Sequence, residues 1–144
     1  MTPSPGDAEL HAVIAERVRA VRAKDVEGLL SGYAPEVATF DLVVPLASQG
    51  IEAVRKRVTE WFASFQTPIE YEIRDVTLQR SGDLAFEHHF THVQGTNRHG
   101  DTIDMWFRET VGYRRLDGRW RVTHQHSSVP LDMVSGKGAL GLKP

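Results

Sequence analysis

The chain contains no cysteine, and none of its apolar runs reaches the ~18 residues that a membrane-spanning helix needs. The absence of cysteine excludes disulfide bonds, thiolate metal sites and a cysteine nucleophile. The first residues also lack the basic segment and apolar stretch of a secretory signal. These absences together predict a cytoplasmic protein that has no membrane partner.

An excess of charge of one sign is missing as well. The 17 Lys and Arg residues nearly balance the 19 Asp and Glu residues, so the formal net charge is −2. A balanced chain offers no broad basic surface to phosphates, and we expect no nucleic-acid partner. The length of 144 residues predicts one domain, with a core over about residues 7–130 and terminal extensions at 1–6 and 131–144.

What the first half of the sequence does contain is helical periodicity. Apolar residues recur at helical spacing over residues 7–23, in a short segment after Asp25, and again from about Gly50 to Phe65. An apolar, β-branched stretch at 37–45 separates the second and third of these segments, and it carries Asp41. Three helices are therefore expected before residue 68.

The second half changes to a period of two, which is typical of strands. Strands are expected from residue 69, over 84–94, over 102–115 and over 120–129. The apolar positions switch parity near Arg74 and Asp75, which predicts a β-bulge there. Helices followed by meandering strands predict an α+β fold: three helices packed on a curved, mainly antiparallel sheet that forms a cone with an internal pocket.

Two segments resemble a known family. KDVEGLLSGYAPEVATFD (residues 24–41) and DGRWRVTHQHSSVP (residues 117–130) are similar to segments of SnoaL-like and ketosteroid isomerase-like proteins, which share the nuclear transport factor 2-like fold. The resemblance implies the cone-shaped fold, a homodimer, and either an enzyme or a non-catalytic module. It places Asp41 at the family's proton-transferring aspartate. Arg17 and Thr110 or Val111 stand where the isomerase has its hydrogen-bond donors, so the isomerase reaction itself is not implied.

Strand alternation supplies further candidates. Asp104, Trp106 and Arg108 share one face of the strand 102–115. Matching Thr110 to the isomerase turns this polar face into the cone and leaves the apolar face for helices or a second copy of the chain. Arginine presents a planar fork to oxyanions, so a charged binding clamp is one interpretation of Arg108.

Histidines form the other candidate group. His124 and His126 fall on one face of the last strand, and His88 lies on the second of the long strands. Histidine titrates near neutral pH and can transfer protons. A metal site is an alternative for this pair, with Asp41, Asp104 or His88 as a third ligand.

The resulting hypothesis is a SnoaL-like enzyme that performs cofactor-free acid/base chemistry, as an isomerase, cyclase, dehydratase or hydrolase. Its partner would be a small apolar molecule with a carbonyl or hydroxyl group. Asp41 would be the base and His126 would relay the proton. The substrate would be bound by His88, Asp104, Trp106, Arg108 and His124, with no metal and no cofactor. The alternative is a non-catalytic ligand-binding or dimerisation module of the same fold.

Overall fold

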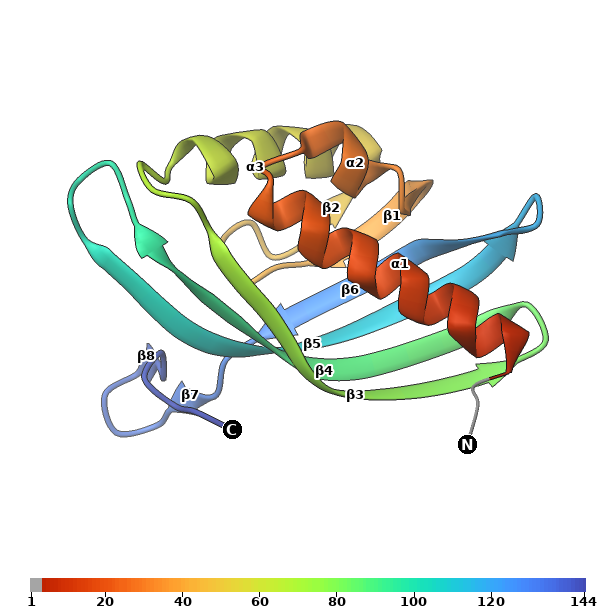
Figure 1. Ribbon diagram of the computed structural model, residues 1–144. Coiled ribbons are helices and arrows are strands. Elements are labelled where there is room, and N and C mark those ends of the chain that lie inside the picture. Colours follow the sequence, from red (N-terminus) through yellow and green to blue (C-terminus); the bar gives the residue numbers. More distant parts are fainter. Residues whose placement is uncertain (1–3) are drawn as a thin grey trace.

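The computed structural model describes residues 4–144 (Figure 1). The three helices are α1 (Pro5–Arg22), α2 (Val26–Leu30) and α3 (Ile51–Ala63). The strands are β1 (Tyr33–Phe40), β2 (Ser48–Gln49), β3 (Glu70–Ser81), β4 (Leu84–Thr96), β5 (Thr102–Leu116), β6 (Arg119–Ser128), β7 (Leu131–Asp132) and β8 (Lys137–Gly138). All three helices lie on the concave side of a strongly curved sheet, as predicted (Figure 1).

Six strands form this sheet in the order β2-β1-β6-β5-β4-β3. The pairs from β3 to β6 are antiparallel and follow one another along the chain, whereas β1 pairs with β6 in parallel. The parallel pair brings the end of β1, and Asp41 just after it, beside the end of β6. The sheet is therefore mainly antiparallel, as the sequence predicts.

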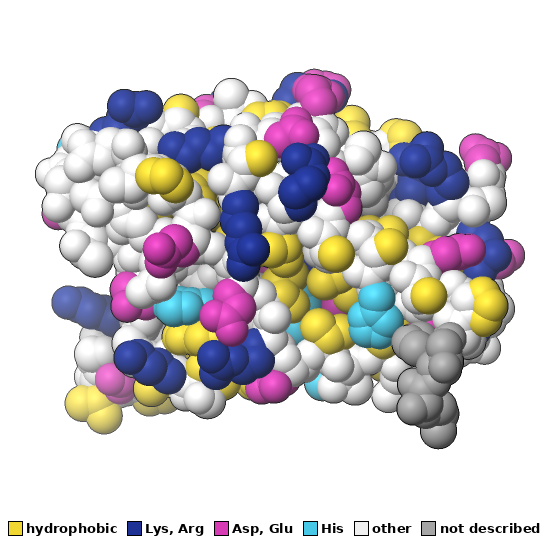
Figure 2. Space-filling model, in the orientation of Figure 1, with side chains coloured by type: hydrophobic (Ala, Val, Ile, Leu, Met, Phe, Trp, Pro, Cys, Tyr) yellow, Lys and Arg dark blue, Asp and Glu magenta, His cyan; other side chains and the backbone are white. Residues whose placement is uncertain are grey.

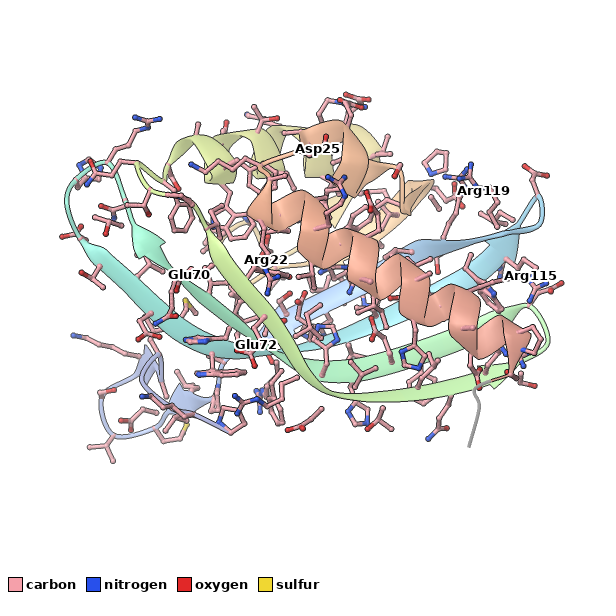
Figure 3. The ribbon with its side chains drawn as sticks, viewed as in Figure 1. Arg22, Asp25, Glu70, Glu72, Arg115 and Arg119 are labelled. Carbon is pink, nitrogen blue, oxygen red and sulfur yellow. The ribbon has the colours of Figure 1, made fainter. Side chains whose placement is uncertain are left out.

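The helix ends follow local capping rules. Ser4 accepts a hydrogen bond from the Asp7 backbone N–H at 3.2 Å, and α1 begins at Pro5, two residues before the predicted start. Residues 1–3 of the expected amino-terminal extension lie outside the described residues. Asp25 caps α2 by accepting from the Gly28 N–H at 2.9 Å (Figure 3).

Two β-bulges set which side chains face the helices. The predicted bulge in β3 is confirmed, since the pairing with β4 shifts between Arg74 and Thr77. A second bulge was not predicted: Gly112 pairs with His124 but Tyr113 pairs with Val122, so β6 contains one extra residue at this point. An extra residue reverses the facing of every later side chain in β6.

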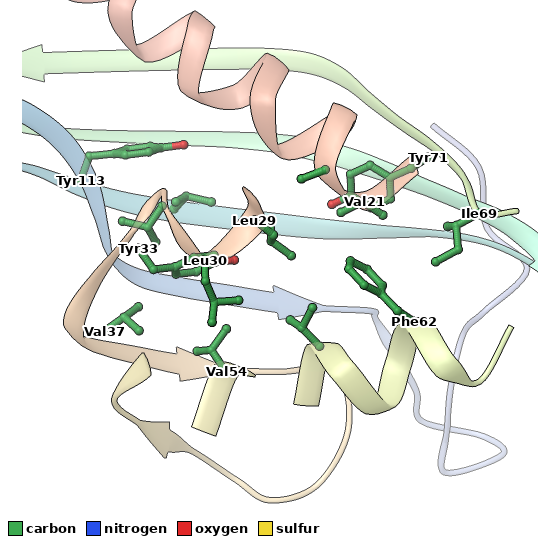
Figure 4. Close-up of a cluster of buried hydrophobic side chains, with 14 of the residues drawn as sticks. Val21, Leu29, Leu30, Tyr33, Val37, Val54, Phe62, Ile69, Tyr71 and Tyr113 are labelled. Atoms are coloured by element: carbon green, nitrogen blue, oxygen red, sulfur yellow. The ribbon is translucent and has the colours of Figure 1, made fainter. Parts of the chain in front are cut away.

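The core lies between the concave face of the sheet and the helices. Val21, Leu29, Tyr33, Phe62 and Tyr71 are among its buried members (Figure 4). Apolar side chains occupy this side because burial removes their surface from water. The Arg22 guanidinium adds a tie between α1 and β3, with Nε donating to the Tyr71 carbonyl at 2.9 Å.

The carboxyl-terminal residues, expected as an extension, form a small β7–β8 hairpin on the convex side of the sheet (Figure 1). Among residues 4–144, no helix is long and apolar enough to cross a lipid bilayer. Basic and acidic side chains are interspersed over the face shown in Figure 2, in keeping with the balanced charge count.

Candidate functional site

A pocket of about 650 Å³ lies between the helices and the concave face of the sheet. Its wall is largely aliphatic and aromatic, with contributions from α1, α3, β1, β4, β5 and β6. The exposed lining residues Val43, Ser64, Arg98 and His99 mark its mouth. The buried polar residues that line it are Arg17, Thr39, Glu109 and Ser127. This volume and composition suit a small, mainly apolar molecule with a few polar groups.

Glu109 is the central polar group of the inner wall. Strand register places His89 on one side of it and Ser127 on the other, all on the concave face. One carboxylate oxygen accepts hydrogen bonds from Thr91 Oγ1 at 2.7 Å and His89 Nε2 at 3.3 Å. The other accepts from Ser127 Oγ at 2.9 Å and from Gln125 Nε2. Four donors occupy both oxygens, so Glu109 is a fixed charge with little capacity left to accept a proton.

Behind this wall lies a second buried carboxylate, Glu87. Arg17 Nη1 donates to Glu87 Oε1 at 3.2 Å, and the Tyr113 hydroxyl donates to the same oxygen at 2.6 Å. The other oxygen contacts His89 Nδ1 at 3.3 Å. His89 thus lies between two carboxylates and donates to both when its ring is protonated. The cluster of Arg17, Glu87, His89 and Glu109 then holds two positive and two negative charges.

The protonation of this cluster follows from its charges. Burial alone would raise the pKa of Glu109, but hydrogen bonds and charge from His89 and Arg17 outweigh it and lower the pKa to about 2. Burial would likewise lower the pKa of His89, but the Glu109 and Glu87 carboxylates raise it above 6.5. Burial raises the pKa of Tyr33, so its hydroxyl stays protonated.

We predict that stability depends on pH on both sides of neutral. A raised pKa for His89 means that its contribution is complete below pH 6.5 and is lost as pH rises through the folded-state value. A lowered pKa for Glu109 means that its contribution is present above pH 4.5 and is lost as pH falls toward 2. Urea unfolding over a pH series should show the highest free energy of unfolding between these limits. His89→Gln should remove the alkaline decline, and an unchanged decline in that variant would contradict the assignment.

A hydrogen-bond chain links the inner wall to the rest of the pocket. The Tyr33 hydroxyl donates to Gln125 Oε1 at 2.5 Å, and Gln125 Nε2 donates in turn to Glu109. After these two bonds, the Gln125 amide has one N–H left to donate, and the Tyr33 hydroxyl oxygen has a lone pair left to accept a hydrogen bond. Both residues line the pocket and can bind a carbonyl or hydroxyl group.

Asp41 is the other carboxylate residue that lines the pocket, and it directly follows β1. Its Oδ1 accepts a hydrogen bond from the Leu42 N–H at 2.6 Å, and its Oδ2 forms an ion pair with Arg57 of α3. The Asp41 side chain is 19% exposed and lines the pocket. Unlike Glu109, this carboxylate has capacity left for a ligand.

The other predicted site residues lie on the convex face. The expected orientation of Asp104, Trp106 and Arg108 is wrong, because the apolar face of β5, which also holds Glu109, packs toward the helices. Asp104 accepts from His92 at 2.7 Å, and His92 stacks on Trp106. Arg108 donates to Ser128 Oγ at 3.1 Å. These contacts join neighbouring strands outside the pocket.

The predicted histidines are also on the convex face. His124 and His126 both pack edge-on against Phe40, and His124 Nδ1 donates to the Ala38 carbonyl at 2.8 Å. Register places His88 and His126 on either side of Thr110. None of these three histidines lines the pocket, whereas Asp41 does. No group of three or more His, Asp or Glu side chains among the described residues is arranged so that it could hold a metal ion.

The sequence interpretation missed the residues that actually form the inner wall. The sequence did not lead us to predict Glu87, His89 or Glu109 as site residues, although all three are buried. Strand alternation could have found them, because each follows the parity of neighbours such as Ala85 and Val111 that belong in the core. The apolar face of β5, which was one candidate surface for a second copy of the chain, packs toward the helices instead. The convex face carries both polar and apolar side chains, so the homodimer stays a prediction.

Comparison with known proteins agrees with this architecture. The chain matches the nuclear transport factor 2-like (NTF2-like) fold of an NTF2-like protein of unknown function from Pseudomonas putida KT2440, with a TM-score of 0.89, 29% identity and complete coverage of both chains. A ketosteroid isomerase-like protein from Erwinia carotovora atroseptica matches with a TM-score of 0.75 and 21% identity over 88% of this chain and 97% of that one.

The family model for the SnoaL-like domain matches residues 10–132. This protein therefore belongs to the SnoaL-like family. No curated protein matches it.

Proposed function

We propose that the protein is a small-molecule enzyme that performs cofactor-free acid/base chemistry in the pocket, with Asp41 as the proton-transferring group. The substrate is a compact, mainly apolar molecule that carries a carbonyl or hydroxyl group. Asp41 takes a proton from carbon next to the carbonyl and returns it at the same or another position. A proton transfer of this kind needs no co-reactant. It accounts for isomerisation when the proton returns to another carbon. It accounts for dehydration when the proton goes instead to a hydroxyl group on the adjacent carbon, whose C–O bond breaks to release water.

One observation carries this proposal: of the two carboxylates that line the apolar pocket, only Asp41 has capacity left for a proton. Glu109 accepts four hydrogen bonds and has a pKa of about 2. Asp41 accepts one backbone hydrogen bond and pairs with one arginine. A base must be able to reach and accept the substrate proton, which favours Asp41. His126, which we expected to relay the proton, does not line the pocket, so it has no role in this proposal.

Each remaining part of the pocket has a role in this proposal. The Gln125 N–H and the Tyr33 oxygen orient the polar group of the substrate, and the apolar wall of α3 and β5 binds its body and excludes water. Exclusion of water strengthens the electrostatic interactions of the fixed charges. Glu109, fixed by His89, Thr91 and Ser127, holds Gln125 in place and takes no part in proton transfer.

Hydrogen–deuterium exchange of simple ketones tests the chemistry without knowledge of the natural substrate. The protein in D₂O is mixed with 1-indanone or 2-tetralone, and loss of the protons next to the carbonyl is followed by NMR. We expect exchange above the buffer rate that saturates with ketone concentration. Saturable ketone binding with exchange at the buffer rate would instead favour the non-catalytic ligand-binding module.

A further inference from the structure

The mouth of the pocket carries a positive charge that forms no ion pair with any carboxylate of the described residues. Three arginines line the pocket, namely Arg17, Arg57 and Arg98. Arg17 pairs with Glu87 at 3.2 Å, and Arg57 pairs with Asp41. Arg98 forms no ion pair within the part of the chain that the structure describes, residues 4–144.

The position of Arg98 is fixed by the end of α3. Its backbone N–H donates to the Ser64 carbonyl at 2.9 Å, and its side-chain Nε donates to the Ala63 carbonyl. The first bond fixes the backbone, and the second holds the exposed guanidinium at the helix end, beside the mouth. Within residues 4–144 the two Nη groups form no hydrogen bond with a side chain, so they can donate to a ligand.

The loop that carries Arg98 is itself ordered by hydrogen bonds. Asn97 Oδ1 accepts from the backbone N–H groups of His99 and Asp101, each at 2.9 Å. Asn97 and His99 line the pocket together with Arg98. A guanidinium held in one place loses less side-chain entropy when it binds an oxyanion, and its fork matches a carboxylate in two hydrogen bonds.

From the unbalanced charge and the anchored side chain we propose that the ligand is an organic anion, an apolar molecule with a carboxylate or another oxyanion that Arg98 binds at the mouth. The apolar body lies in the pocket and the acid group lies at the surface. This inference rests on the proposed function, since it names the substrate class for the same pocket. The oxyanion-binding role that the sequence suggested for Arg108 thus passes to Arg98, at the mouth of the pocket.

A matched pair of fluorescent probes tests the inference. 1-Anilinonaphthalene-8-sulfonate and N-phenyl-1-naphthylamine share the same aromatic body, and only the first carries an oxyanion. We expect Arg98→Gln to raise the Kd of the sulfonate about ten-fold, as for loss of one charge-assisted hydrogen bond. The Kd of the neutral probe should not change. Arg98→Lys should restore most of the sulfonate affinity, and Arg74→Gln, on the convex face, should leave both probes unaffected.

The outcomes separate this inference from the proposed function. Equal effects of Arg98→Gln on both probes, or no effect on either, would overturn the role of Arg98 as an anion-binding residue while the pocket stands. If neither probe binds the wild-type protein, the pocket itself fails as a ligand site, and the proposed function fails with it. A salt titration adds a second readout, because sodium chloride should weaken binding of the sulfonate only.

Discussion

Asp41→Asn is expected to lower the rate of ketone exchange by about 10²–10⁴-fold, the usual contribution of a general base. Asparagine has nearly the same shape and can still accept the hydrogen bond from the Leu42 N–H. It cannot take up a proton from carbon, so the chemistry is lost while the pocket remains. The measurement is the same NMR exchange of 1-indanone in D₂O, at saturating ketone.

Two controls make the result specific to Asp41. Asp75→Asn alters an exposed aspartate at the β3 bulge, where φ is +60° and asparagine is tolerated, and it should exchange ketone at the wild-type rate. Binding of N-phenyl-1-naphthylamine to Asp41→Asn should equal that of the wild type, which shows that the pocket is intact. An Asp41→Asn protein that binds the probe and still exchanges ketone at full rate would remove Asp41 from the mechanism.

Glu87→Ala is expected to destabilise the fold by about 3–5 kcal/mol, because it leaves buried charges without their partner. Arg17 would keep only the Tyr113 hydroxyl at 2.7 Å, and His89 would keep only Glu109. Two positive charges and one negative charge would then be buried together. Urea unfolding followed by circular dichroism measures the loss.

Matched variants show whether the loss comes from charge. Glu72→Ala removes an exposed carboxylate that pairs with Arg74 at 3.4 Å, and it should cost less than about 1 kcal/mol (Figure 3). The double variant Arg17→Met with Glu87→Leu removes both partners and should be less destabilised than the sum of the single changes. Strict additivity of the two single changes would show that they do not interact.

The fold could be predicted because its signals are local. Helical spacing, the Asp25 cap, the glycine before α3 and the parity switch near Arg74 each depend on a few neighbouring residues, and the structure has all four. The order of helices and strands then limits the possible topologies. The early start of α1 was missed although Ser4 and Pro5 are local signals of a helix start.

Which side chains of each strand point toward the helices was harder to predict. In β6 a single extra residue at the bulge separates Val122, which faces inward, from His124, which faces outward. Nothing in the local pattern of this strand marks the bulge, so an unbroken alternation put both on one face. In β5 the polar face was turned inward by the match at Thr110, against the simpler rule that apolar faces are buried.

Buried charge is the other part that sequence reasoning did not reach. Glu87 is stable inside because Arg17, 70 positions earlier in the chain, lies beside it. His89 and Glu109 are stable there because they pair with each other across neighbouring strands. Pairing of this kind depends on the assembled sheet and helix, not on spacing along the chain. Asp41 was identified because it follows a recognisable segment, whereas Arg98 lies in a loop whose shape only the structure reveals.

Ligand binding on the concave side of the sheet can be tested directly by NMR. The chain offers matched reporters in ¹³C-methyl methionine and ¹⁵N-indole tryptophan: Met105 and Trp61 line the pocket, whereas Met133 and Trp106 do not. Addition of N-phenyl-1-naphthylamine should shift the Met105 and Trp61 signals and leave those of Met133 and Trp106 in place. Shifts at Trp106 or Met133, with Met105 and Trp61 unchanged, would place the site on the convex face and contradict the account.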